Sequence, residues 1–281
     1  MKLNTARVHE TLEHADRCHA AYHAAETFGG PSLYFHRRAL ETRHAPASPQ
    51  HLEYVYATLA SWGMHRMGAG GSKMRAFEEF SASVEPLEKK IVEAQGFKPG
   101  AMNEAGWSTL KDIFSGLKIM ASSTSLVGNS KVMHHMLPNI VPPIDREYTL
   151  RYLYGNTMIA NDVDKEWRTM REIISGFFIP VASDSAFAAK ADKWIAVQRP
   201  WDTSVMKTID NLLIGSRKSE AFDNRKETRG WQFTTTRVDV QNAGTTVRLT
   251  TVGRFTISRV AAQSVATTRN LATCRVWPRR S

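Results

Sequence analysis

The sequence predicts an all-α fold, a compact multi-helix domain over residues 1–216 with a β-prone basic tail over residues 217–281. Three observations support this prediction. Apolar residues recur at helical spacing through most of the first 216 residues. Capping residues, prolines and glycines stand where these apolar stripes begin and end. Beyond Gly215 the stripes stop, and short alternating segments rich in threonine and valine replace them.

Local signals delimit the helices of the first hundred residues. A first helix is expected from about residue 4 to residue 28, where two glycines and a proline follow. Ser48 and Pro49 open the next helix, as a capping residue followed by a proline in the first turn. Pro86 interrupts a third stripe that begins after Ser72, and therefore predicts a kink or a break.

The second hundred residues carry a succession of shorter stripes. Between two of them, the proline-rich segment 138–143 cannot continue a helix. The expected helices cover about residues 103–121, 129–137, 145–154, 163–177, 183–197 and 202–214.

Net charge divides the chain into two parts. The total is +10, but residues 225–281 hold eleven basic and two acidic residues, a charge of +9, against +1 for residues 1–224. Within the tail, residues 242–244 could turn a hairpin between threonine-rich segments. The tail is expected to be either a nucleic-acid-binding ribbon with salt-dependent affinity or a disordered or non-native extension.

Size and composition are those of a globular protein. The 281 residues can bury a sizeable core, and no run approaches the roughly 18 apolar residues of a membrane span. The polar, histidine-rich start lacks the apolar core of a signal peptide. The two cysteines lie near opposite ends of the chain, which favours a reducing compartment. We therefore expect a cytoplasmic protein without membrane contact, bound metal or cofactor.

Residues 105–154 carry a more specific chemical prediction. They read as a helix, a glycine-containing turn, a helix, a proline loop and a helix. A tight turn before a helix exposes backbone N–H groups and the positive end of the helix dipole, which suits a phosphate. The turn at residues 122–131 would place Gly128 and Asn129 there, and Ser130 and Lys131 would add a hydroxyl and a cation.

From Met120 to Tyr154 the chain resembles the helix-hairpin-helix DNA glycosylase superfamily. That family has an apolar–Gly–x–Gly hairpin, a lysine soon after it, and an aspartate that opens a later helix. The chain offers Leu126-Val127-Gly128, then Lys131, then Val141-Pro142-Pro143-Ile144-Asp145-Arg146, with one hairpin glycine and a shorter spacing from lysine to aspartate. The resemblance implies that Lys131 stands in the place of the lysine nucleophile and Asp145 in that of the catalytic aspartate.

The resemblance also implies a mechanism. A glycosylase turns one base out of the stack into a pocket. Lys131 would attack the sugar carbon C1′, and Asp145 would stabilise the positive charge that develops on the sugar. The expected nucleic-acid-binding residues are Gly128, Asn129, Ser130 and Arg146, and the candidates for an aromatic wall are Trp107, Tyr148 and Tyr152.

Each of these residues also has a structural interpretation. Asp145 follows two prolines and suits a helix N-cap, Lys131 suits the solvated surface, and Trp107 lies on an apolar stripe that suits the core. Two functions therefore stay open. One is a DNA- or other nucleic-acid-binding protein, with a glycosylase-like base-excision enzyme as its specific form; the other is a non-enzymatic helical interaction protein.

Histidines offer two further interpretations. His19 and His23 are one helical turn apart and could share a metal with a neighbouring cysteine or aspartate, although a solvated polar face explains them more simply. Either His134 or His135 could act as a base or phosphate ligand near the hairpin. The other would point elsewhere, because adjacent helical positions diverge by about 100°.

Overall fold

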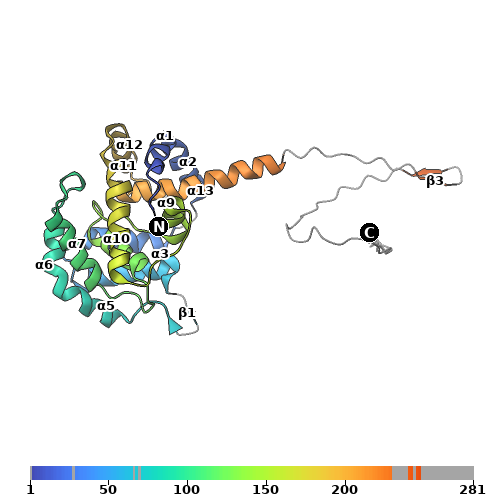
Figure 1. Cartoon of the computed structure of the whole chain (residues 1–281). Helices are drawn as coiled ribbons and strands as arrows, with labels where there is room; N and C mark the ends of the chain where they lie inside the picture. Colours follow the sequence, from blue (N-terminus) through green and yellow to red (C-terminus); the bar gives the residue numbers. More distant parts are fainter. Residues whose placement is uncertain are drawn as a thin grey trace. The chain divides into compact units, whose positions relative to one another are not determined.

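The computed structural model describes residues 2–26, 29–65, 67–68, 71–229, 240–242 and 245–247. It divides into two units, Met1–Gly230 and Trp231–Ser281. The first unit is mostly helical and forms a multi-helix domain, which confirms the all-α prediction (Figure 1).

The described elements of the first unit follow one another along the chain with short connections. Up to residue 101 they are α1 (Ala6–Glu13), α2 (Ala15–Ala25), α3 (Pro31–Thr42), α4 (Pro49–Leu59), η1 (Ala60–Met64), β1 (Met67–Gly68), β2 (Gly71–Ser72), α5 (Phe77–Val84), η2 (Glu85–Leu87), α6 (Glu88–Ala94) and η3 (Pro99–Ala101). Then come α7 (Glu104–Gly116), α8 (Leu126–Met136), η4 (Arg146–Leu150), α9 (Arg151–Tyr154), α10 (Val163–Ile173), η5 (Ile174–Phe178), α11 (Ile179–Ser183), α12 (Ser185–Ala196) and α13 (Val205–Arg229).

Several helix boundaries agree with the local signals. The Ser48 hydroxyl accepts the N–H of His51 at 3.3 Å, so it caps α4 as predicted. Pro86 lies in η2, which separates α5 from α6 and confirms the expected break. The expected first helix is instead two helices, because the chain leaves helical geometry at His14 between α1 and α2.

The hairpin segment differs from the prediction. The helix α8 begins at Leu126, so Gly128 and Asn129 lie inside the helix rather than in a turn before it. All residues from Gly128 to Met136 are buried. The neighbours of α8 are α3, α4, α7 and α10. A helix enclosed in this way lies in the interior of the domain.

The long helix α13 packs along α2, and both contribute to the functional site described below (Figure 1). Their approach is close at Gly215, where an added Cβ would lie 1.9 Å from the backbone oxygen of Cys18. Only glycine fits this crossing without a shift of one helix. The expected domain boundary at residue 216 therefore falls inside α13, which continues to Arg229.

Beyond α13 the structure describes two short strands, β3 (Val240–Asn242) and β4 (Thr245–Val247), paired antiparallel. The remaining predicted strands of the tail lie outside the described residues. In the described part of the chain, no single helix is long and apolar enough to cross a membrane. The bent pair Val163–Ser183 and Ser185–Ala196, with 83° between its halves, passes that test by length and composition.

Candidate functional site

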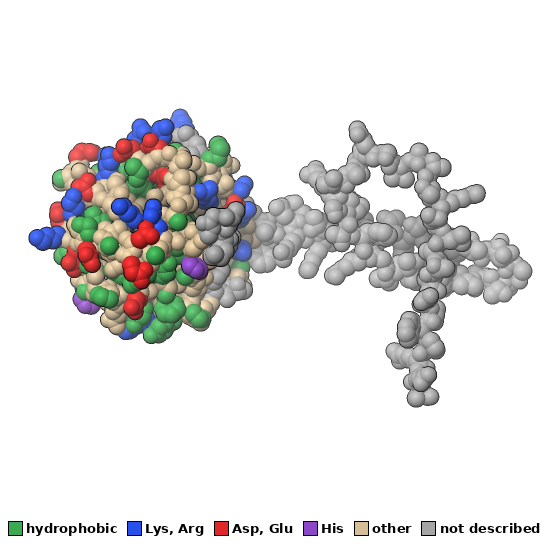
Figure 2. Space-filling view, turned by 90° about the horizontal axis from the view of Figure 1, so that it is seen from below, with side chains coloured by type: hydrophobic (Ala, Val, Ile, Leu, Met, Phe, Trp, Pro, Cys, Tyr) green, Lys and Arg blue, Asp and Glu red, His purple; other side chains and the backbone are tan. Residues whose placement is uncertain are grey.

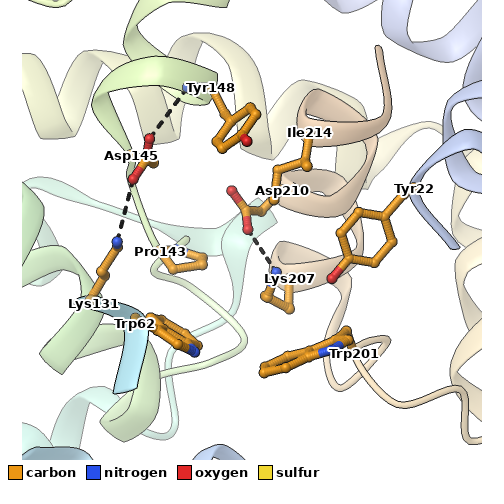
Figure 3. Close-up of a pocket in the computed structure, with 10 residues that line it drawn as sticks. All are labelled: Tyr22, Trp62, Lys131, Pro143, Asp145, Tyr148, Trp201, Lys207, Asp210 and Ile214. Carbon is orange, nitrogen blue, oxygen red and sulfur yellow. Dashed lines mark hydrogen bonds and ion pairs between the residues drawn. The ribbon is translucent and has the colours of Figure 1, made fainter. Parts of the chain in front are cut away.

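A cavity of about 180 Å³ lies between α13 on one side and α8 with the start of η4 on the other (Figure 3). Its lining combines ammonium groups, carboxylates and aromatic rings. The residues that line it are Tyr22, Trp62, Lys131, Pro143, Asp145, Tyr148, Trp201, Lys207, Asp210 and Ile214.

Lys131 and Asp145, the two predicted catalytic residues, meet in this cavity. Lys131 Nζ lies 3.4 Å from Asp145 Oδ2. The lysine side chain is only 10% exposed, whereas that of the aspartate is 33% exposed. Lys131 is therefore not the solvated surface lysine of the structural interpretation, and the carboxylate can be reached from solvent.

Asp145 uses its two carboxylate oxygens for different purposes. Its Oδ1 accepts the backbone N–H groups of Glu147 at 2.8 Å and Tyr148 at 3.4 Å, so the residue caps η4 as the structural interpretation expected. Its Oδ2 faces Lys131. The helix cap thus fixes the carboxylate and leaves one oxygen for the cavity.

A second pair, which the sequence interpretation missed, stands on the opposite wall (Figure 3). Lys207 Nζ lies 2.8 Å from Asp210 Oδ2 and also donates to Asn211 Oδ1. Both side chains of the ion pair are nearly inaccessible, at 5% and 6%. Burial raises the pKa of Asp210, and the neighbouring Lys207 ammonium opposes this shift. A possible signal was present, because both charged residues lie between the apolar positions Met206, Ile209, Leu212 and Leu213 of the α13 stripe.

Aromatic rings form much of the remaining wall. The Trp62 and Trp201 rings are 6.2 Å apart at an angle of 52°. Lys131 Nζ lies 5.5 Å from the centre of the Trp62 ring, and Lys207 Nζ lies 5.9 Å from that of Trp201. The face of a tryptophan ring thus attracts each ammonium group and offsets part of the hydration that the group loses on burial. Such rings also offer flat surfaces on which a planar ligand can stack.

A chain of buried histidines supports Lys131 from behind. His135 Nδ1 donates to the Lys131 carbonyl oxygen at 2.7 Å, which leaves its Nε2 to accept from His36 Nδ1 at 3.0 Å. His36 Nε2 then accepts from the Thr203 hydroxyl at 2.9 Å. Burial holds the pKa of both imidazoles well below the ordinary value, so both are neutral.

His134 and His135 were candidates for a base or phosphate ligand. His134 Nδ1 donates to the Val141 carbonyl oxygen at 2.8 Å, and burial lowers its pKa to about 3. Both histidines are fully buried, and neither lines the cavity. Their described contacts are with the protein interior, where they hold α8 and the proline loop in place.

The predicted phosphate-binding residues of the hairpin have interior positions. An added Cβ on Gly128 would lie 2.5 Å from Met120 Cγ, so this glycine allows close packing. The Asn129 amide donates to the carbonyls of Phe114 and Leu117 at the end of α7. The Ser130 hydroxyl accepts the N–H of Ile144 at 3.2 Å. These contacts correct the expectation of an exposed turn at Gly128, Asn129 and Ser130.

The start of α8 is also closed to an outside anion. The Glu166 carboxylate accepts the backbone N–H groups of Ser125 and Leu126, and its side chain thus occupies the position where a phosphate was expected. Arg146 remains exposed, and its guanidinium donates to the Thr124 hydroxyl at 3.1 Å. Of the four predicted nucleic-acid-binding residues, only Arg146 therefore has an exposed side chain.

The three aromatic candidates separate. Tyr148 lines the cavity. Trp107 is buried beside Trp167, with ring centres 6.4 Å apart, in agreement with the core interpretation. The Tyr152 hydroxyl lies 3.1 Å from the Thr11 hydroxyl, away from Lys131, and lines a neighbouring surface cavity.

That neighbouring cavity, of about 320 Å³, shares Tyr148 with the first. Three arginines contribute to its lining, namely Arg7, Arg151 and Arg217. Arg7 pairs with Glu10, whereas Arg151 and Arg217 both pair with Glu147, at 3.1 Å and 3.2 Å, so these three arginines exceed their carboxylate partners by one positive charge. Elsewhere on the helical unit, Figure 2 shows a face on which basic and acidic side chains are intermixed.

Three comparisons with known proteins gave no match for the chain. No family model matches the chain. No curated protein and no solved structure matches it either.

Proposed function

We propose that the chain binds nucleic acid and acts on a single base in the manner of a base-excision glycosylase. The observation that carries the proposal is the 3.4 Å approach of the buried Lys131 ammonium to Asp145 in a cavity with aromatic walls. A lysine beside a carboxylate provides a nucleophile with a proton acceptor. Aromatic side chains provide the stacking surface that a flipped base requires.

The size of the cavity favours one ring system. At about 180 Å³ it is smaller than the roughly 300–1,000 Å³ of sites for drug-sized ligands. The arginines around the adjoining cavity favour a base that remains attached to a phosphate backbone, since Arg151 and Arg217 share a single carboxylate. Tyr148 lines both cavities and would lie between the base and the backbone.

In the proposed reaction, Lys131 first gives a proton to Asp145. The neutral Nζ then attacks C1′ of the flipped nucleotide, and the bond from C1′ to the base breaks with its electron pair leaving on the base, which takes up a proton. Asp145 passes the first proton to the departing base, and the carboxylate that this restores stabilises the positive charge on the sugar. Nζ then loses a second proton, O4′ takes up a proton as the sugar ring opens, and a Schiff base forms between Lys131 and C1′.

Borohydride trapping tests this proposal, because it reduces the Schiff base to a stable covalent adduct. The full chain is incubated with duplex and single-stranded oligonucleotides that contain uracil, 8-oxoguanine or an abasic site. We expect an adduct with wild type and none with K131Q. K98Q, at an exposed lysine, is the matched control and should still be trapped.

The variant D145N separates capping from catalysis. Its amide oxygen can still accept the N–H groups of Glu147 and Tyr148, but it has no negative charge and cannot accept the lysine proton. We expect D145N to fold normally and to lose at least 100-fold in trapping rate. Equal trapping in K131Q and wild type would overturn the role of Lys131, because another amine would then form the adduct. No trapping of any of these oligonucleotides by wild type would favour the non-enzymatic interaction protein.

A further inference from the structure

Two histidines and an aspartate converge near the cavity but do not line it. His19 and His23 are one turn apart on α2, and Asp202 lies in the segment before α13. His19 Nε2 is 2.8 Å and His23 Nε2 is 3.0 Å from Asp202 Oδ2, and the two nitrogens are 3.1 Å from each other. The sequence interpretation preferred a solvated polar face for these histidines over a shared metal, whereas His19 is buried.

We propose that His19, His23 and Asp202 bind a divalent transition-metal ion such as Zn²⁺. At the tetrahedral angle, bonds of about 2.0–2.2 Å to nitrogen and oxygen hold neighbouring ligand atoms about 3.3–3.6 Å apart. The three observed separations, 2.8, 3.0 and 3.1 Å, are about 0.2–0.5 Å shorter than this range, so small side-chain movements would admit the ion. Two imidazoles and one carboxylate are ligands that such ions prefer, whereas Ca²⁺ and Mg²⁺ prefer oxygen ligands only.

Hydrogen bonding alone accounts poorly for this geometry. If both Nε2 atoms carry hydrogens toward Asp202, the two N–H groups crowd each other across 3.1 Å. If only one carries a hydrogen, the other nitrogen directs its lone pair at a carboxylate oxygen. A cation at the centre satisfies all three lone pairs at once.

Further contacts hold the three ligands in position. The Asn211 amide donates to Asp202 Oδ1 at 2.9 Å and leaves Oδ2 for the histidines. The Trp194 ring stacks on His19 with centres 3.9 Å apart and planes 8° from parallel. Such outer contacts are typical of metal sites, where they orient the ligands. The His23 side chain is 15% exposed, so the site borders on solvent.

The ion would join two walls of the cavity. His23 neighbours Tyr22 on α2, and Asp202 follows Trp201; both aromatic residues line the cavity. Asn211 bonds to Asp202 and also accepts from Lys207. Metal binding would therefore fix the segment before α13 on α2. This inference stands independently of the proposed base excision, because it concerns different side chains and has its own readout.

The test uses the untagged full chain, stripped with a chelator and dialysed. Titration with Zn²⁺ should show one ion per chain and a rise in Tm that grows with Zn²⁺ concentration, because the ion binds the folded state. Co²⁺ should bind at the same stoichiometry and give the visible absorption bands that are typical of Co²⁺ in a coordination site of low symmetry. A wild-type chain that takes up neither ion at micromolar concentrations would overturn the proposal.

Variants locate the ion. H23A and D202N each remove one of three ligands, so we expect affinity to fall by more than the roughly 10–100-fold that loss of an outer-shell contact costs. H44Q, at an exposed histidine, is the matched control and should bind as wild type does. Should D202N fail to fold, H23A decides the question, since its side chain is partly exposed. Equal Zn²⁺ affinity and equal Tm shift in H23A and wild type would overturn the proposed site.

Discussion

The two lysine–carboxylate pairs of the cavity have the same chemistry but different settings. Lys207 and Asp210 are three residues apart on one helix and are almost inaccessible to solvent. Lys207 also donates a hydrogen bond to Asn211. Lys131 and Asp145 come from different elements, are separated by 3.4 Å, and include a carboxylate that is one third exposed. The first pair is arranged to hold α13 in place, whereas the second leaves an ammonium and a carboxylate oxygen within reach of a ligand.

The largest expected effect comes from breaking the buried pair. K207M leaves the Asp210 carboxyl group in the interior without its cation, which should cost about 3–5 kcal/mol of unfolding free energy at pH 7. K131M leaves a carboxylate that solvent can reach, so its cost should be below about 1 kcal/mol. Urea unfolding monitored by circular dichroism measures both. Equal losses in the two variants would contradict the division of roles between the pairs.

The next effect concerns the helix that carries the buried pair. G215A places a methyl group against the backbone of α2, where its Cβ would lie 1.9 Å from the Cys18 oxygen. Because backbone must move to make room, we expect a loss of about 2–3 kcal/mol, at the upper end of overpacking effects. G100A, at a glycine where an added Cβ meets nothing within 4 Å, is the matched control for thermal unfolding.

Acid should destabilise the packing of α4 and α8. Burial lowers the pKa of His134 to about 3 and that of His51 to about 4, both below the ordinary value of 6.5. The unfolded chain therefore binds more protons than the folded chain below pH 6.5. The stability that these two neutral histidines contribute is fully present above pH 6.5. It is lost as the pH falls toward the pKa of each histidine in the folded chain, by about 1.4 kcal/mol per pH unit for each histidine.

The variant H134Q isolates one of these contributions. Its unfolding free energy should fall less steeply than that of wild type between pH 6.5 and pH 4, by about one histidine's share of the slope. H44Q, at an exposed position, should keep the wild-type slope. An unchanged slope in H134Q would mean that His134 does not stay neutral in the folded state.

The smallest effect concerns the arginines beside the exposed pair. The double variant R151Q/R217Q removes two cations that share Glu147 and should weaken oligonucleotide binding several-fold. If both contact phosphates, the slope of log affinity against log salt should decrease by about 1–2. R38Q, at an arginine paired with Glu41, is the control. Fluorescence anisotropy at two salt concentrations gives the comparison, with the basic tail present in every sample.

Local sequence signals were sufficient where one residue determines a helix end. Ser48 caps α4, Pro86 separates α5 from α6, and Asn103 caps α7 through the N–H of Gly106 at 2.9 Å. These interactions lie within three residues along the chain, so the sequence contains all that they require. Gly128 shows the limit of such reasoning. It was taken for a turn residue, but close packing against Met120 decides its place inside a helix.

The candidate site could be predicted only in part for the same reason. The resemblance to the glycosylase superfamily pointed to Lys131 and Asp145, and the fold brings them together. Lys207 lies 76 positions after Lys131 in the chain, and Trp62 lies 69 positions before Lys131. No local pattern links residues so far apart, because their proximity results from the packing of α2, α4, α8 and α13.

Local patterns predicted the helical character of residues 1–216, the principal breaks between helices, and the concentration of positive charge after residue 224, but not the continuation of α13 to Arg229. Which polar residues are buried, and which of them meet, was decided by the packing of distant segments. Burial depends on contacts between distant segments, and it is burial that turns Lys131, Lys207 and the pair His19 and His23 from surface residues into groups with partners. Desolvation makes an unpaired charge costly, so the packed interior selects the partners that the linear order conceals.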